Sequence, residues 1–149
     1  MIDLDVMLAA YGNPDKPEKK EKALHLLREV EIGVHELHTS YTLMDIVSAW
    51  NIEFFRTKVH EFYVKHSKEI ITARSLEEKL SASGKEVKAL LKKFVSIGVK
   101  EEDAVLAVIA SVFEVGLKTF NKTHLLNKLG SINKILREEG LNEISISEP

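Results

Sequence analysis

The sequence predicts an all-α protein that folds as one compact domain of about seven to eight helices. The first observation is the segment 104–117, which is apolar on nearly every side of a helix. The second is a set of amphipathic segments at helical spacing before and after it, and the third is the small number of turn residues, with 7 glycines and 3 prolines in 149 residues. A helix that is apolar all round has to be buried all round. We therefore expect a central helix at about 101–119, with the other helices packed around it.

The composition sets limits on the class of protein. A chain of 149 residues with 44% hydrophobic content suits one domain, residues 1–149, with one core. The absence of cysteine excludes disulfides, thiol nucleophiles and cysteine-ligated metals. The apolar run is too short to span a bilayer, so we expect a soluble, cytoplasmic protein without membrane contacts. The absence of glutamine and the dominance of Lys and Glu among the charged residues resemble the composition of a thermophile.

The first 17 residues divide into two parts. Residues 1–11 are expected to form an N-terminal helix or arm, with Asp3 as a plausible N-cap. The linker 12–17 follows, because its two prolines and a Gly-Asn pair interrupt a helix. An alternative remains open, since apolar and polar residues alternate at both ends of the chain, so the termini could form a short β ribbon.

The helical core is expected over 18–140, followed by an acidic tail over 141–149. From Glu18 to about Tyr41, apolar residues recur at heptad spacing, which predicts one helix and a possible self-association seam. The seam consists of Leu27, Val30, Val34, Leu37 and Tyr41. It lasts less than three heptads, so ordinary core packing is the alternative. Further helices are expected at about 42–50, 53–71, 75–82 and 87–97, with a last helix from about 121 to 139.

Two features point to nucleic acid as a partner. Residues 43–63 resemble the outline of a helix-turn-helix, in which the second helix would present Arg56, Lys58 and His60 to DNA. Phe54 and Phe55 crowd that surface, so two packed core helices are the alternative reading. The last helix carries a run without acidic residues over 118–137, and its candidate phosphate contacts are Lys122, Lys128, Lys134 and Arg137.

The sequence contains no catalytic or metal-binding motif with the required residue spacing. His35 and His38 lie one turn from Glu31, but neither a Glu-x-x-His pair nor a His-Glu-x-x-His motif occurs. We therefore expect no catalytic residues, no metal and no cofactor.

The sequence accordingly predicts a non-catalytic helical interaction module that works through protein–protein contacts and forms a homo-oligomer. Segments of opposite net charge would orient the partners. A nucleic-acid-binding regulator or accessory factor is the alternative. A small-ligand sensor with a cavity beside the central helix is a weaker one.

Overall fold

The computed structural model describes residues 1–149 and is mostly helical, which confirms the predicted fold class. The helices are α1 (Leu4–Tyr11), α2 (Pro17–Glu31), α3 (Tyr41–Ser48), α4 (Glu53–His66), α5 (Ala73–Ala82), α6 (Val87–Ser96), α7 (Glu101–Val112) and α8 (Leu129–Glu138), with a 3₁₀ turn η1 (Leu126–Lys128). The strands are β1 (Leu37–Ser40), β2 (Ser67–Ile71), β3 (Leu117–Lys118) and β4 (Ile146–Ser147).

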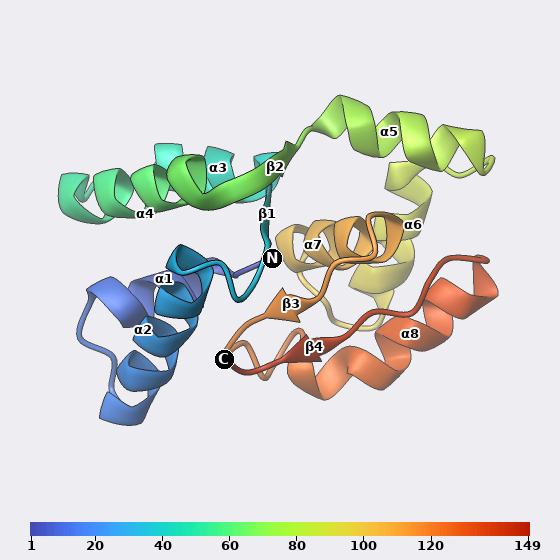
Figure 1. Cartoon of the computed structure of the whole chain (residues 1–149). Helices are drawn as coiled ribbons and strands as arrows, with labels where there is room; N and C mark the ends of the chain where they lie inside the picture. Colours follow the sequence, from blue (N-terminus) through green and yellow to red (C-terminus); the bar gives the residue numbers. More distant parts are fainter.

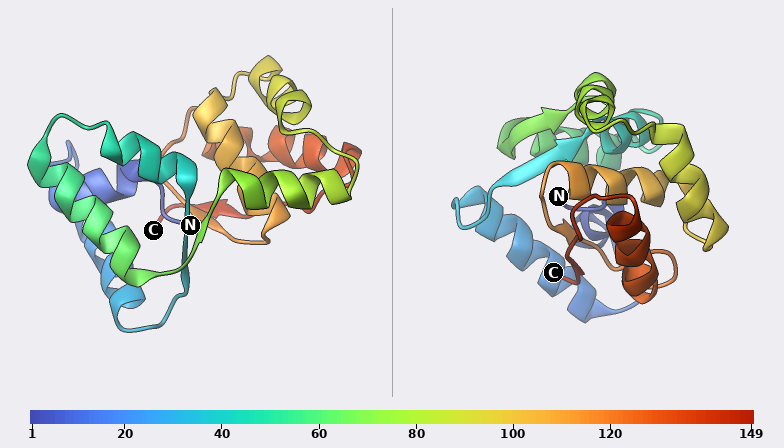
Figure 2. Two further views of the ribbon diagram at one scale, coloured as in Figure 1. Left: turned by 90° about the horizontal axis from the view of Figure 1, so that it is seen from above. Right: turned by 90° about the vertical axis from the view of Figure 1, so that its right-hand side faces the viewer.

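The helices form two groups with the strands between them. Helices α1 to α4 lie on one side of the molecule and α5 to α8 on the other (Figures 1 and 2). Helix α3 contacts α7 across this division, and β1 pairs with β2 where the chain passes from one group to the other. The two groups therefore meet along the strands and around α7.

Segments from both ends of the chain pair with β3. Ile2 forms a parallel bridge with Lys118, and β4 pairs with β3 in parallel on the other side. The backbone N–H of Asp3 donates to the Lys118 carbonyl at 2.9 Å, and that of Thr119 donates to the Ser147 carbonyl at 3.1 Å. The termini thus contribute to a short β ribbon, but they flank β3 and do not pair with each other.

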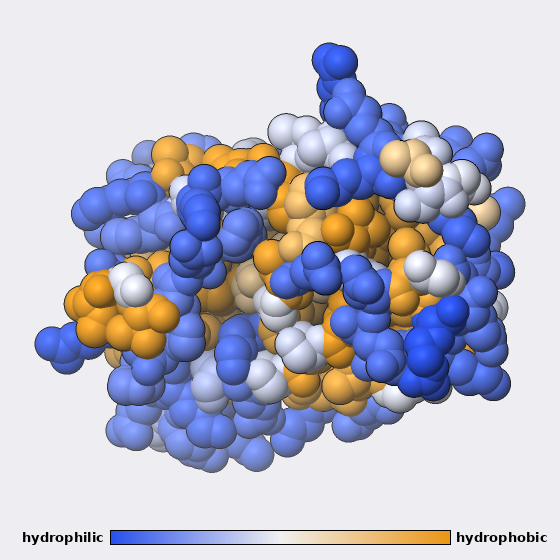
Figure 3. All heavy atoms as spheres, turned by 45° about the vertical axis from the view of Figure 1, so that its right-hand side comes forward, coloured by the Kyte–Doolittle hydropathy of each residue, from blue (hydrophilic) through white to orange (hydrophobic).

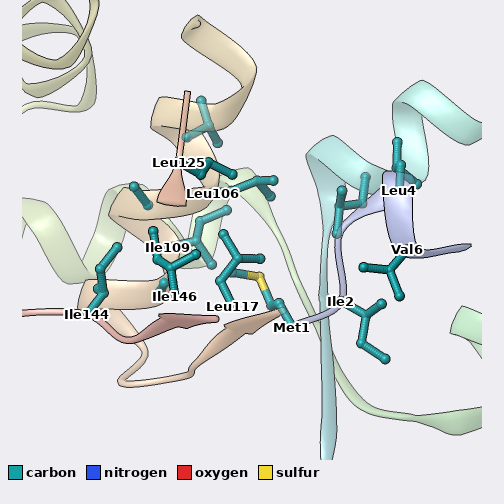
Figure 4. Close-up of a cluster of buried hydrophobic side chains, with 14 of the residues drawn as sticks. Met1, Ile2, Leu4, Val6, Leu106, Ile109, Leu117, Leu125, Ile144 and Ile146 are labelled. Carbon is teal, nitrogen blue, oxygen red and sulfur yellow. The ribbon is translucent and has the colours of Figure 1, made fainter. Parts of the chain in front are cut away.

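Helix α7 is the buried centre of the fold, as the apolar run predicts. Every residue from Ala104 to Ser111 is at most 8% exposed. Figure 4 shows the side chains of Leu106 and Ile109 gathered with those of Leu117 and Met1. The helix ends at Val112, earlier than the predicted 119, because Glu114 has a φ of 54° and turns the chain toward β3.

Two predicted helices are wrong at their C-terminal ends. The helix expected over 18–41 ends at Glu31, where Gly33 takes a φ of 79°, and Leu37 already belongs to β1. The helix expected over 53–71 ends at His66. Strands β1 and β2 pair in parallel, which satisfies backbone groups that a helix would otherwise have satisfied.

The C-terminal part also differs from expectation. Only the segment from Leu129 is α-helical, so the predicted last helix is too long at its start. Residues 141–149 pack against the body of the protein and do not extend as a tail, because Ile144 and Ile146 are buried. None of the helices combines the length and the apolar character that a bilayer crossing requires.

Candidate functional site

The candidate site lies where several parallel-paired segments end. Asp3 directly follows Ile2, and Thr119 directly follows β3. Thr42, in the first turn after β1, lines the same pocket as Asp3. Ligands of sheets with parallel strands bind outside the carboxyl ends of the strands, because the loops that follow adjacent strands converge there. Ile2 and β3 end at one edge of the first sheet, and Thr42 reaches the same pocket from the end of β1, which belongs to a second sheet.

Asp3 and Asp5 are held by the loop that follows β3. Asp3 is the N-cap of α1, and its carboxylate accepts the backbone N–H of Leu4 at 2.7 Å and the Thr119 hydroxyl at 2.8 Å. One oxygen of Asp5, Oδ2, accepts the Thr119 hydroxyl at 3.1 Å and the Phe120 backbone N–H at 3.0 Å. Thr119 is fully buried, so its hydroxyl fixes both carboxylates relative to each other.

A third carboxylate comes from the first turn of α7. Asp103 accepts a hydrogen bond from the Asn121 side-chain amide at 3.1 Å. The side-chain oxygen of Asn121 in turn accepts the backbone N–H of His124 at 3.0 Å. The N-termini of α1 and α7 therefore both supply carboxylates to one site, at the helix ends whose dipoles favour negative charge.

These groups surround a pocket of about 410 Å³. Its lining includes Asp3, Asp5, Asp103, Asn121 and His124. Lys100, Glu102 and Thr42 also line it. Two of its polar atoms, Asp5 Oδ1 and Thr42 Oγ1, are buried without a hydrogen-bond partner. Buried polar atoms are normally paired, so these two residues of the pocket lining have unmet hydrogen-bonding capacity.

Burial and mutual repulsion disfavour the ionised carboxylates. Burial, followed by the negative charge of Asp3, raises the pKa of Asp5 to about 6. Burial also raises the pKa of Asp3, against the hydrogen bonds from Thr119 and Leu4. For Asp103, burial and then the charge of Asp3 raise the pKa in the same direction. The negative charge of Asp3 therefore contributes to the raised pKa of both other carboxylates.

The same charges reach a buried tyrosine behind the site. Tyr63 of α4 is fully buried, and its hydroxyl donates to the Ile2 carbonyl at 2.8 Å. Burial, and then the charges of Asp3 and Asp5, raise the pKa of Tyr63 well above its ordinary value. Tyr63 therefore remains a neutral donor that supports the segment from which Asp3 projects.

The arrangement suits a positively charged ligand with few direct protein contacts. No three side chains among Asp, Glu and His converge closely enough to enclose a metal ion. Mg²⁺ differs from Ca²⁺ and Zn²⁺ in this respect, because it keeps several waters and commonly uses only one or two carboxylates. Oxygen donors, which Asp3, Asp5, Asp103 and Asn121 all supply, are the ligands that such a cation prefers.

The residues predicted for a DNA-reading helix lie elsewhere. The two helices of the proposed helix-turn-helix are present as α3 and α4. Arg56 donates to the Trp50 carbonyl at 3.0 Å, so it holds the connection between them, whereas Lys58 and His60 are exposed. Ile52 and Phe54 are more than half exposed at the start of α4, where base-contacting polar side chains would be needed.

The predicted basic residues of the last helix are dispersed. Lys122 precedes η1, next to Asn121, and lies 3.4 Å from Glu148. Lys128 is half-buried at the end of η1. Lys134 and Arg137 lie on α8 and pair with Glu138 and Glu143. Of this set, only Lys122 directly adjoins a residue of the acidic pocket.

The predicted self-association seam does not form one helical face. Leu27 and Val30 lie on α2 and are buried, and Leu37 is buried in β1. Val34 is 59% exposed in the connection between them, and Tyr41 is half-buried at the start of α3. The seam residues therefore divide between the core and an exposed connection.

The acidic pocket was not predicted from the sequence. Asp3 could be recognised as a helix N-cap, but nothing in the spacing joins it to Asp103 or Asn121, which lie more than 95 residues further along. The signal available was the alternation of Ile2 and Leu4 with Asp3 and Asp5. This alternation indicates an extended N-terminal segment that carries carboxylates.

Comparisons with known proteins add no relative. No protein-family model matches the chain, and no curated protein or solved structure gives a significant match. The functional argument therefore depends on the pocket itself.

Proposed function

We propose that the acidic pocket binds a hydrated divalent cation, Mg²⁺ or Mn²⁺, and that the protein uses it to hydrolyse phosphodiester bonds in nucleic acid. The observation that carries this proposal is a pocket lined by three carboxylates with raised pKa values, of which Asp5 Oδ1 is buried without a partner. Clusters of perturbed carboxylates in a pocket are typical of functional sites. The proposal differs from the non-catalytic module expected from the sequence.

A bound cation would oppose the effect of burial on these carboxylates and, at Asp5 and Asp103, the repulsion from Asp3. Because Mg²⁺ retains waters and completes its shell with substrate phosphate oxygens, one or two of the carboxylates here would be sufficient protein ligands. Asp3, Asp5 and Asp103 are the residues that would hold the cation, which would supply a lowered pKa of a bound water and neutralisation of the phosphate charge, the two requirements of phosphodiester hydrolysis.

The rim of the pocket supplies positive charge for the substrate. Lys100 lines the pocket, whereas Lys122 follows Asn121 in the chain without lining the pocket and lies 3.4 Å from Glu148. Lysines at such positions attract phosphates and release counterions on binding. This part of the proposal retains Lys122 from the basic residues identified in the sequence.

The first test is cation-dependent cleavage. We expect labelled single-stranded RNA or DNA to be cut in Mn²⁺ or Mg²⁺ and to remain intact in EDTA. Isothermal titration calorimetry with Mn²⁺ alone should show binding that weakens between pH 7.5 and pH 5, because protons compete for the carboxylates. Absence of both cation binding and cleavage at pH 7.5 would overturn the proposal.

Self-association is a second candidate function, and one observation favours it. Ile32 and Val34, in the connection after α2, are 69% and 59% exposed, which is unusual for large apolar side chains so close together. Figure 3 shows patches of apolar side chains between hydrophilic ones on one face of the molecule.

The weaker alternative from the sequence, a small-ligand sensor with a cavity beside the central helix, stays a prediction.

We expect light scattering to give a mass above 16.8 kDa, and the paired change Ile32→Ser and Val34→Ser to return it to the monomer value. The matched control is Val95→Ser, which removes an apolar side chain that is 48% exposed on α6. A monomeric mass for the unmodified protein would exclude this candidate.

A further inference from the structure

A second pocket adjoins the acidic pocket through a shared residue. It has a volume of about 360 Å³, and Asp5 lines both pockets. Its other lining residues include Leu8, Asn13, Asp15, Lys19, Phe55 and Phe120. The two pockets are therefore neighbours on either side of Asp5.

Two aromatic rings form the apolar part of this pocket. Phe120 follows Thr119, and its backbone N–H donates to Asp5, so its position is tied to that of the carboxylate. Phe55 comes from α4 and is half-buried, as is Phe120. A Cβ on Gly12 would lie 3.5 Å from the Phe55 ring, so this part of the wall carries no side chain. Rings that are fixed but still partly exposed can stack on a flat ligand.

The charges around the rings favour a neutral occupant. Lys19 Nζ lies 5.6 Å from the centre of the Phe120 ring and 3.8 Å from the Asp15 carboxylate. The carboxylates of Asp5 and Asp15 both line the pocket and would repel a phosphate. The side-chain amide of Asn13 can donate and accept hydrogen bonds. A planar, neutral ring with hydrogen-bonding edges fits these surroundings better than an anion does.

We propose that this second pocket is a nucleobase subsite in which one unpaired base stacks on Phe120, with Phe55 lining the same pocket. The inference rests on the proposed function for its substrate class, since a phosphodiester at the acidic pocket would place an adjacent base here. Because the stacked base leaves its own strand stack, the substrate is single-stranded.

The test compares binding of a labelled short oligodeoxyadenylate with that of a strand of equal length made of abasic tetrahydrofuran units. Fluorescence polarisation in Mg²⁺, measured in the cold before the strand is cut and with strand integrity checked on a gel, should give about tenfold tighter binding of the base-bearing strand. Phe120→Leu should reduce this preference to less than about twofold, and Phe120→Tyr should retain it.

The matched control is Phe113→Leu. Phe113 forms the other lysine–aromatic pair of the protein, with Lys79 Nζ 5.0 Å from its ring centre, and it lines neither pocket. This variant should keep the base preference. If Phe120→Leu fails to fold, Lys19→Met tests the subsite without changing a ring. Lys19→Met should then weaken the preference for the base-bearing strand.

The outcomes separate the two proposals. Equal binding of base-bearing and abasic strands by the unmodified protein, or an unchanged preference in correctly folded Phe120→Leu, would overturn the subsite. Cleavage in Mn²⁺ with no base preference would leave the phosphodiester proposal standing alone. Base-dependent binding with no cleavage in any cation would support the subsite and overturn the proposed hydrolysis.

Discussion

The substitution Asp103→Asn should reduce cation-dependent cleavage about a hundredfold at pH 7.5. The amide keeps an oxygen that can accept the Asn121 hydrogen bond, so the local fold should survive, but the pocket loses one of its three carboxylates. The loss should appear both as a lower rate at saturating Mn²⁺ and as a weaker Mn²⁺ affinity in calorimetry.

The control for this variant lies on the same turn of α7. Glu101→Gln removes one negative charge from an exposed side chain that does not line the pocket. We expect it to keep its cleavage rate within about twofold. An Asp103→Asn protein that folds and cleaves as fast as the unmodified protein would exclude Asp103 from the site.

The substitution Asp5→Asn should stabilise the protein at pH 7.5 when divalent cations are removed with EDTA. Burial and the charge of Asp3 raise the pKa of Asp5 from 3.8 to about 6 in the folded state. The folded protein therefore binds this proton more tightly than the unfolded chain does. Its stability falls as the pH rises from about 4 through about 6, at a cost on the order of 2 to 3 kcal/mol.

Asp5→Asn has no such proton to lose, so its free energy of unfolding should fall less than that of the unmodified protein between pH 4 and pH 7.5. Urea unfolding at both pH values measures the difference, with Glu101→Gln as the variant expected to match the unmodified protein. Mg²⁺ should narrow the difference at pH 7.5, because it stabilises only the chain with the full set of carboxylates. A destabilised Asp5→Asn protein at pH 7.5 in EDTA would contradict this account.

Together the two variants distinguish a site from a structural cluster. Carboxylates that served only to hold the fold would be expected to increase its stability. A charged group whose replacement stabilises the protein indicates that the charge is retained for another purpose.

The parts of the fold that local patterning determines were predictable from the sequence. The start of α2 at Pro17 and the N-cap of α1 at Asp3 follow from residue chemistry at a helix terminus, and the burial of α7 follows from its composition. These features need no information from distant residues.

The contribution of the termini to a short β ribbon was predicted, but the pairing around β3 and the site could not be predicted, for one shared reason. β3 and β4 contain two residues each, too few for a periodic pattern, and they exist because segments far apart in the chain meet. Asp103 and Asn121 were likewise ambiguous, since acidic residues and asparagine are common at helix starts for local reasons. Only the parallel pairing of Ile2 with Lys118 places these residues beside Asp3.

The pairing of β3 with both β4 and the segment at Ile2 also sets an order for events during synthesis. A nascent chain on the ribosome has its first carboxylates exposed while residues 117–121 are still untranslated or inside the exit tunnel. The strand that holds Thr119 gains its second neighbour only after residues 146–147 emerge. Because Thr119 and Asn121 hold Asp3, Asp5 and Asp103, the three carboxylates should remain apart until residues 117–121 have left the ribosome. The proposed hydrolytic centre would then be absent from a nascent chain that ends before this segment.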